Sequence, residues 1–310
     1  MYDTVNMWFD RSLVNYYNVA TITSNINNYS EYYNKGKRII TGHLNNYRIY
    51  ASDSGVCLNG SLCKYFYGNN INILNRKDTR ETIEKISDEL NLPIYLAKVN
   101  RVDFAANLTM QEAVYNYFPY LGDKRYFKRV LATNDSLYYN TKEMQLYFYN
   151  KTKEAKEKKG DIPIEFKDEN LLRYEIRYEK KLPKRFGMRE VTAANLYDEK
   201  FYQNLKNQWA SEYSSIYKIN KPSIVNTIEI KTPLHGKKML CGLMLAKEGY
   251  DFIESYLREL KAKNVFPDPK NYSRLKSDLT EMANMPEISE RSELIVELDD
   301  KIALAKEYYL

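Results

Sequence analysis

Apolar and polar residues alternate along much of the first 75 residues, which is the pattern of half-buried β-strands. Turn signals such as Asp53-Ser54-Gly55 separate the alternating segments. An amphipathic helix then follows, and it ends before Pro93. The pattern predicts strands at residues 4–9, 37–44, 47–51 and 56–62, and a helix at residues 78–90.

The middle of the chain returns to strand patterns. After a long strand at 94–108, Thr109 and Glu112 stand at the spacing of a capping box, which predicts a helix at 109–120. Consecutive strands with few helices between them are typical of an α+β fold, an antiparallel sheet with helices packed on one face. The remaining elements expected here are strands at 126–131, 136–141, 145–150 and 171–179 and a basic helix at 152–159.

Helical periodicity replaces strand alternation after about residue 190. We therefore divide the chain into an α+β domain, residues 1–190, and a mostly helical C-terminal region, residues 191–310. Helical segments are expected at 191–216, 234–263, 271–284 and 290–309, with a break at Pro267-Asp268-Pro269.

Charge gives a mild indication of the partner. The 310 residues have a formal net charge of +6, and thirteen lysine and arginine residues fall between positions 151 and 189. This favours a polyanionic partner such as DNA. Acids are interleaved with these cations, so a solvated, salt-bridged helix and hairpin is an equal alternative.

Several function classes lose support from the rest of the sequence. Cys57, Cys63 and Cys241 have neither a paired framework nor metal-ligand spacing, and His43 and His235 form no His-x-His pair. The sequence has no glycine-rich phosphate loop, dinucleotide fingerprint or nucleophile elbow. A signal-peptide pattern and an apolar run of about 20 residues are also absent, so we expect a cytoplasmic protein outside the membrane.

Three acids on neighbouring predicted elements could share a divalent cation. Asp103 and Glu175 lie within predicted strands, and Glu154 lies in the first turn of the basic helix. A buried carboxylate without a partner costs several kcal/mol, so a strand does not normally carry one unpaired. Oxygen ligands are those that Mg²⁺ prefers.

An alternative is a solvated sheet face of ion pairs. Asp103 has Arg101 two residues away, and Glu175 lies between Arg173 and Arg177. The residues alone leave this alternative open.

Tyr149 is the candidate nucleophile. A free tyrosine has a pKa of about 10, so its attack on phosphorus needs a cation or metal that stabilises the phenolate. Lys151 shares the predicted strand face of Tyr149 at i+2. Tyr147 is the main competitor, because it lies on the same face, and the chain has thirty tyrosines, an excess that AT-rich codons can explain.

Five segments occur in a characteristic order along the chain. They are Gly60 to Asn70, which reads G-S-L-x-K-[FY]-x-x-G-N-N, then Val99 to Phe104, Tyr149 to Lys151 with Glu154, Leu172 to Arg177, and Lys184 to Gly187. Together they resemble the replication initiation proteins of filamentous phages, the gene II/X family. Cys63 and the helical C-terminal region depart from that family's pattern.

The resemblance implies a site-specific single-strand DNA endonuclease and strand transferase that initiates rolling-circle replication. A tyrosine becomes linked to the 5′-phosphate, the freed 3′-OH primes synthesis, and a second transesterification closes the displaced strand. By their places in the motifs, Tyr149 would be the nucleophile, Lys151 its helper, and Asp103, Glu154 and Glu175 the ligands of Mg²⁺ or Mn²⁺. The remaining residues, Arg101, Arg173, Arg177, Lys184 and Arg185, would contact phosphate or DNA. For Lys151, Arg101 and Arg173 the resemblance leaves two roles open, stabilising the scissile phosphate or orienting the acids.

The resemblance also implies partners and leaves alternatives. Double-stranded origin DNA and single-stranded DNA are the expected partners in the cytoplasm of a bacterial host, with a host helicase or polymerase and self-association as further expectations. A relaxase-like nickase for plasmid mobilisation would share the site, and a non-catalytic DNA-binding replication regulator is the alternative from another class.

Overall fold

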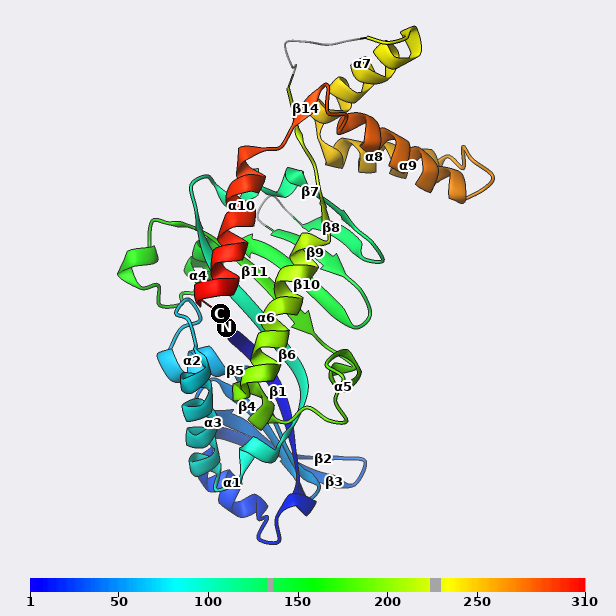
Figure 1. Cartoon of the computed structure of the whole chain (residues 1–310). Coiled ribbons are helices and arrows are strands. Elements are labelled where there is room, and N and C mark those ends of the chain that lie inside the picture. The colour runs from blue at the N-terminus through cyan, green and yellow to red at the C-terminus, as the bar shows by residue number, and fades with distance from the viewer. Residues whose placement is uncertain (133–135, 224–229, 310) are drawn as a thin grey trace.

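A ten-stranded antiparallel sheet dominates the structure (Figure 1). The computed structural model describes residues 1–132, 136–223 and 230–309. The strands are β1 (Tyr2–Asp10), β2 (Asn27–Asn34), β3 (Lys37–Leu44), β4 (Tyr47–Ser52), β5 (Gly55–Ser61), β6 (Lys98–Met110), β8 (Lys128–Ala132), β9 (Ser136–Asn140), β10 (Met144–Asn150) and β11 (Asn170–Tyr178). Their spatial order is β2-β3-β4-β5-β1-β6-β11-β10-β9-β8.

The other elements are short or lie outside the large sheet. Two small sheets pair β7 (Leu121–Lys124) with β12 (Ile216–Lys218) and β13 (Lys221–Pro222) with β14 (Ser289–Glu290). The helices are α1 (Val19–Asn25), α2 (Leu62–Tyr67), α3 (Arg76–Leu90), α4 (Lys151–Glu157), α5 (Leu182–Arg185), α6 (Glu199–Ser214), α7 (Pro233–Glu248), α8 (Tyr250–Ala262), α9 (Lys270–Ala283) and α10 (Glu293–Leu304).

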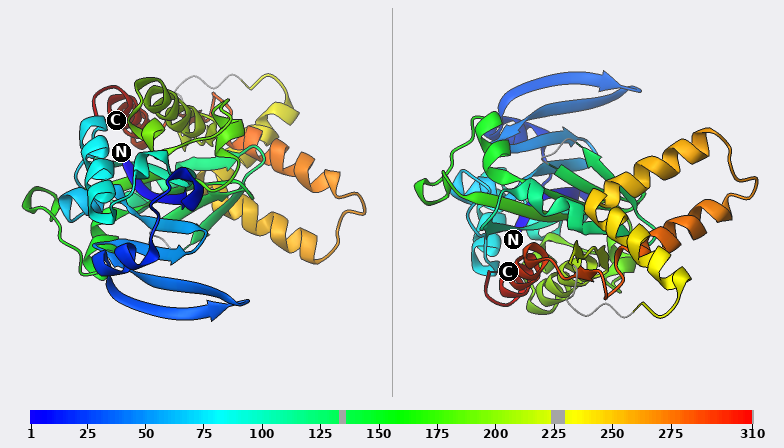
Figure 2. Two further views of the ribbon diagram at one scale, coloured as in Figure 1. Left: turned by 90° about the horizontal axis from the view of Figure 1, so that it is seen from below. Right: turned by 90° about the horizontal axis from the view of Figure 1, so that it is seen from above.

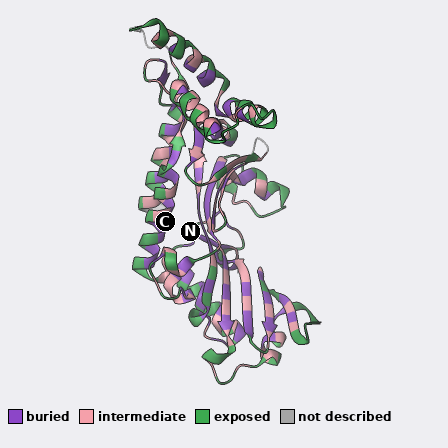
Figure 3. Ribbon diagram, turned by 90° about the vertical axis from the view of Figure 1, so that its right-hand side faces the viewer, coloured by how far each residue is buried: buried purple, intermediate pink, exposed green. Residues whose placement is uncertain are grey.

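Alternation along the strands gives the large sheet two different faces. In β10, Leu146 and Phe148 are fully buried on one face, whereas Tyr147 and Tyr149 are half-buried on the other. Helices α6 and α10 cover the first face (Figures 1 and 3). Trp209 of α6 is fully buried there against Tyr174. We call the opposite face, which carries Tyr147 and Tyr149, the open face.

Helices α7, α8 and α9 form a unit with its own small core. The buried residues of that core include Leu245, Ile253, Leu257 and Ala283. Figure 2 shows α8 and α9 projecting from the body as a helical hairpin. Because α6 and α10 share the core of the sheet, packing groups them with the strands. The division of functions between residues 1–190 and 191–310 stays a prediction.

The predicted fold class is confirmed, since an antiparallel sheet carries helices on one face and a helical region follows it. The helix predicted at 109–120 is wrong. Strand β6 continues to Met110, opposite Asn170, and two 3₁₀ turns follow. Glu297 of α10 explains the difference, because its carboxylate accepts from the Gln111 backbone N–H at 2.8 Å and from the Tyr117 hydroxyl at 2.5 Å. These tertiary contacts outweigh the local capping signal.

Two further differences have simple causes. Strand β2 lacks the apolar alternation that predicts a strand, because all eight of its residues are exposed. The helical segment expected at 234–263 is divided at Gly249, whose φ of +85° ends α7. Among the described helices, none combines the length and apolar character required to cross a bilayer.

The α7–α9 unit depends on close approach of two helices at Gly242. A Cβ at this position would lie 2.1 Å from the carbonyl oxygen of Met282. We predict that Gly242→Ala separates α7 from α9 at a cost of roughly 1–3 kcal/mol. Faster amide hydrogen exchange in α7 and α9, with unchanged exchange in β6 and β11, is the expected measurement.

Gly236→Ala is the matched control on the same helix. Among the described residues, the nearest atoms to a Cβ there belong to the flexible Ile230 side chain, at 3.2 Å. Alanine favours the helix over glycine, so this variant should keep the wild-type exchange of α9. Equal exchange in both variants would contradict the proposed close packing.

Candidate functional site

Side chains from neighbouring strands meet on the open face because residues directly opposite in an antiparallel pair point the same way. Strand β11 lies between β10 and β6 in the sheet. The register sets three pairs opposite each other: Tyr149 and Arg173, Tyr147 and Glu175, and Arg177 and Asp103. Three of the predicted motifs therefore come together at one place.

Arg173 lies at the centre of this cluster with an exposed fraction of 0%. Its guanidinium donates to Glu175 at 3.0 Å and to Asp3 at 2.6 Å. It also donates to the Asn70 carbonyl and the Asn107 amide oxygen, each at 3.0 Å. The enclosed guanidinium holds two carboxylates in place, which is the arrangement expected if Arg173 orients the acids. Contact of Arg173 with a phosphate stays a prediction.

Asp3 belongs to the cluster, and sequence reasoning missed it. Burial alone would raise the pKa of Asp3, but Arg173 and a hydrogen bond from Ser61 hold that pKa below its usual value. The side-chain amide of Asn70 donates to Asp3 at 3.0 Å. Asp3 lies in β1, but the strand predicted from the sequence begins at residue 4, so the argument about buried strand acids did not reach it.

The segment from Gly60 to Asn70 shapes this end of the site. Ser61 caps α2 by accepting from the Lys64 backbone N–H at 3.2 Å. Gly68 ends the helix with a φ of +77°, a left-handed conformation that glycine adopts without a steric penalty. The turn then brings Asn70 to Asp3 and Arg173.

Asp103 is buried within a set of charges. Arg101 donates to it through two nitrogens, at 2.8 and 2.6 Å, and Arg177 donates at 3.1 Å. Burial, together with the Glu175 carboxylate, raises the pKa of Asp103 to about 6, although Arg101 and Arg177 act to lower it. Arg177 also donates to Glu175, at 3.3 Å. The ion pairs of the alternative interpretation are thus present, but Asp103 and Glu175 are buried rather than solvated.

The two candidate tyrosines differ in their partners. The Tyr149 hydroxyl donates to Glu175 at 3.5 Å. The Tyr147 hydroxyl accepts from Arg177 at 3.2 Å and donates to Gln145, while the Arg177 guanidinium lies 4.6 Å from the centre of the Tyr147 ring. Burial raises the pKa of both phenols, and raises that of Tyr149 well above its ordinary value although Arg173 opposes the shift.

Tyr149 borders two adjoining hollows. One, of about 530 Å³, is lined by Tyr138, Tyr147 and Tyr149 among other residues. The other, of about 370 Å³, contains Tyr149 and four acids, Asp3, Asp103, Glu154 and Glu175. The three acids expected from the sequence therefore face one space together with the candidate nucleophile.

Lys151 lies elsewhere than the strand pattern predicts. Asn150 accepts from the Lys153 backbone N–H at 2.9 Å and so begins α4 at Lys151, which takes Lys151 out of the strand. The buried Lys151 ammonium donates to Glu154 at 2.6 Å, and Lys158 contacts the other carboxylate oxygen at 2.6 Å. Burial lowers the pKa of Lys151, and these two cations lower that of Glu154 against the effect of burial.

The donor chemistry of the hollow suits Mg²⁺ or Mn²⁺, because its acids offer hard oxygen ligands. Their arrangement is set by cations, however. Asp103 and Glu175 are paired with arginines, and Glu154 with lysines. In the part of the chain that the structure describes, no three His, Cys, Asp or Glu side chains are grouped as metal ligands would be.

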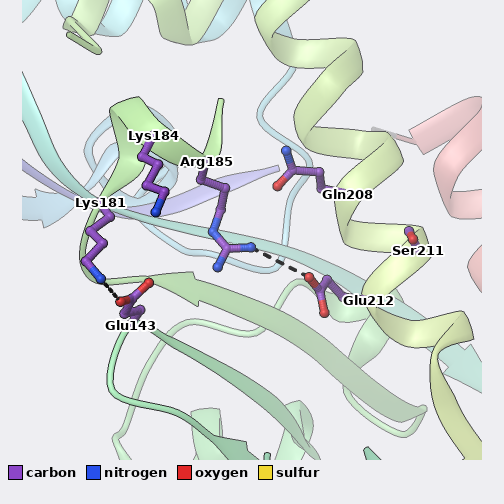
Figure 4. Close-up of a pocket in the computed structure, with 7 residues that line it drawn as sticks. All are labelled: Glu143, Lys181, Lys184, Arg185, Gln208, Ser211 and Glu212. Atoms are coloured by element: carbon purple, nitrogen blue, oxygen red, sulfur yellow. Dashed lines mark hydrogen bonds and ion pairs between the residues drawn. The ribbon is translucent and has the colours of Figure 1, made fainter. Parts of the chain in front are cut away.

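Lys184 and Arg185 lie at a separate pocket of about 340 Å³ (Figure 4). Arg185 approaches Glu212 of α6 at 3.7 Å, and Lys181 pairs with Glu143. Glu143 precedes β10, whereas Tyr149 lies near the end of that strand. The structure therefore does not bring these two cations to the Tyr149 cluster.

Comparison with known proteins agrees with the resemblance seen in the motifs. The family model for the N-terminal part of the phage replication-associated gene II protein matches residues 1–212, which include every side chain of the cluster. A search of curated proteins gives no match.

Loss of the central guanidinium should destabilise the whole domain. Arg173→Met leaves Asp3 and Glu175 without their shared donor, and an unpaired buried charge costs about 3–5 kcal/mol. We predict a fall of this size in the free energy of unfolding, measured by denaturant titration.

Two variants test the cause of that loss. Arg101→Met should cost less, because Asp103 keeps Arg177 and Arg101 is partly exposed. Adding Asp3→Asn to Arg173→Met should recover part of the stability, because it removes one unpaired carboxylate. A loss below about 1 kcal/mol for Arg173→Met, the size of a surface ion pair, would contradict the central role of Arg173.

Proposed function

Because the chain belongs to the family of replication-associated gene II proteins and is a replication initiation protein, we propose that it nicks one strand of origin DNA through Tyr149 and transfers the strand. The observation that carries this proposal is the position of the Tyr149 hydroxyl. It borders the hollow that four acids line, and it hydrogen-bonds to one of them, Glu175.

The proposed step exchanges one phosphodiester for another. The Tyr149 oxygen forms a bond to phosphorus, the bond from phosphorus to the 3′-oxygen breaks, and the phenol proton leaves while the 3′-oxygen gains a proton. Glu175 accepts the phenol's hydrogen bond at 3.5 Å and so is placed to receive that proton. The number of phosphodiester bonds does not change, so the step needs no energy from a nucleoside triphosphate.

Tyr149 suits this role better than Tyr147 because of its position. Tyr149 is among the residues that line the hollow with the four acids, whereas Tyr147 lines the adjoining hollow. Each phenol has an arginine partner, since Arg177 donates to the Tyr147 hydroxyl and Arg173 lies opposite Tyr149.

Other residues of the cluster take supporting roles in the proposal. The side chains of Arg101 and Arg177 are 29% and 25% exposed, so both can reach a phosphate as well as Asp103. Asp103, Glu175 and Glu154 would hold Mg²⁺ or Mn²⁺. When bound, such an ion would act as a Lewis acid on the phosphate oxygens. Lys151 would fix the orientation of Glu154 through the ion pair they form.

A relaxase-like nickase would use the same residues and differ only in biological setting. A non-catalytic regulator would need no tyrosine beside an acid-lined hollow, so the geometry favours an enzyme. Contacts of Lys184 and Arg185 with DNA, contacts with a host helicase or polymerase, and self-association stay predictions.

The proposal predicts a covalent protein–DNA adduct that depends on one hydroxyl. Incubation with supercoiled origin DNA and Mg²⁺ or Mn²⁺ should give relaxed DNA and a denaturation-resistant adduct. Tyr149→Phe should abolish the adduct, because phenylalanine lacks the attacking oxygen, while the fold is retained.

Tyr147→Phe is the matched control, since it removes a hydroxyl from the same strand and face. It should retain the adduct, although its yield can fall if Arg177 moves. If Tyr149→Phe forms the adduct and Tyr147→Phe does not, Tyr147 is the nucleophile and the assignment to Tyr149 is wrong. Wild-type protein that forms no adduct with either metal would favour the regulator.

A further inference from the structure

The outer edge of the sheet exposes a ribbon of aromatic and basic residues. Every residue of β2 is exposed, and Tyr33 has an exposed fraction of 70%. Figure 2 shows β2 and β3 extending from the body as a two-stranded ribbon. An open, flat edge strand invites unwanted pairing, so natural proteins usually shorten or cover it. A long exposed one with tyrosines is therefore a candidate binding surface.

The open face continues without a break from this ribbon to Tyr149. The pairing registers align two rows of side chains across β3, β4, β5, β1 and β6. The row nearer the Tyr149 cluster is His43, Arg48, Asn59, Asn6 and Arg101, and the next row is Thr41, Tyr50, Cys57, Trp8 and Lys98. Asn59 also lines the acid hollow together with Asp103 and Tyr149. We call these ten residues the outer rows.

The outer rows have aromatic, polar and cationic members and no carboxylate. The Arg48 guanidinium lies 4.9 Å from the centre of the Tyr50 ring. Trp8 is half-buried, and its ring lies against Gly55, where a Cβ would come within 2.9 Å of it. Half-exposed rings beside cations are the arrangement on which unpaired bases stack while their phosphates are neutralised.

Charge along the ribbon fits the same kind of ligand. Residues 27–52 contain four lysine or arginine residues against one acid, Glu31. That acid is matched by Arg38, which donates to both of its oxygens at 2.8 Å. Lys35 and Lys37 lie at the turn between the two strands. The ribbon is therefore net positive, complementary to a phosphate backbone.

We propose that the outer rows and the β2–β3 ribbon bind single-stranded DNA that flanks the nick, with bases stacked on Trp8, Tyr50 and Tyr32, which lies on the same face of the ribbon as Thr41. This inference rests on the proposed nicking function, because it gives the strand at Tyr149 a path across the sheet. The observations favour a single strand over a duplex, since half-exposed rings can stack only on base faces that a duplex keeps covered.

The two tryptophans of the chain make direct binding measurable. Trp8 lies in the outer rows, whereas Trp209 is fully buried under the other face. Titration of the full chain with a single-stranded oligonucleotide, without metal, should quench selectively excited tryptophan fluorescence. Trp8→Phe should remove the quenching, because only Trp209 remains. The same titration with Tyr149→Phe should quench normally, which separates strand binding from nicking.

Variants in the β2–β3 ribbon test whether the DNA-binding surface extends beyond the outer rows. Tyr32→Ala removes an exposed ring that lies opposite Ile39, on the same face as Thr41 and His43, and should weaken oligonucleotide binding on the order of tenfold. Tyr33→Ala removes a ring from the other face of the ribbon and should bind as the wild type does. Tyr126→Ala is the matched control, because Tyr126 is 82% exposed and lies between β7 and β8, away from the ribbon. It should bind as the wild type does.

Four outcomes would overturn the proposal. If Trp8 fluorescence does not respond to the oligonucleotide, the DNA does not bind at the outer rows. A Tyr32→Ala variant that binds as tightly as Tyr126→Ala would exclude the ribbon from the binding surface. Binding and quenching by duplex DNA alone would show a duplex surface instead. Loss of self-association in the ribbon variants, with unchanged DNA affinity, would assign the edge to a second copy of the chain. Loss of adduct formation with normal quenching would instead indicate failure of the proposed nicking function alone.

Discussion

The arrangement of the site depends on one buried guanidinium. Arg173 is fully enclosed, and its acceptors come from β1, β6, β11 and the turn after α2, which are far apart in the sequence. A buried arginine costs several kcal/mol unless its donors are satisfied. These segments are therefore constrained to meet around it. The same constraint fixes Asp3 and Glu175 beside Tyr149, so stability of the domain and geometry of the site share one origin.

Burial and the neighbouring charges have opposite effects on the ionisable groups of the cluster. Burial raises the pKa of Asp103 and Tyr149, which favours their neutral forms. Arg101 opposes this shift for Asp103, and Arg173 opposes it for Tyr149. Glu175 raises the pKa of both groups, so the charges of this small region are mutually dependent. A bound phosphate would add a negative charge to this region and would contact Arg101 and Arg177, whose side chains are partly exposed. The fold thus supplies cations at the rim and acids in the hollow.

Periodicity and motif order predicted much of this arrangement because they report local and strand-level properties. Alternation assigns β10 and β11 their faces, so the sequence alone is enough to place Tyr149 and Glu175 on one surface. Asp3 was missed because its partner Arg173 is 170 residues away, and the 109–120 segment failed because Glu297 contacts it from a distant helix. The burial of Arg173 was equally invisible, since only the folded sheet encloses it. Strand β2 was not predicted because all eight of its residues are exposed, so it lacks the apolar alternation of a half-buried strand.

The two faces of the sheet meet different physical demands with the same two-residue period. One face must exclude water under α6 and α10, and there the sequence places residues such as Phe148, Tyr174 and Trp209. The other face is free to carry polar and half-exposed aromatic groups over many strands. A large antiparallel sheet therefore provides the reacting tyrosine and an extended surface on one rigid support. The register of the β-strands fixes the position of every row relative to Tyr149. A single DNA strand bound along those rows would therefore reach the hollow in one defined position.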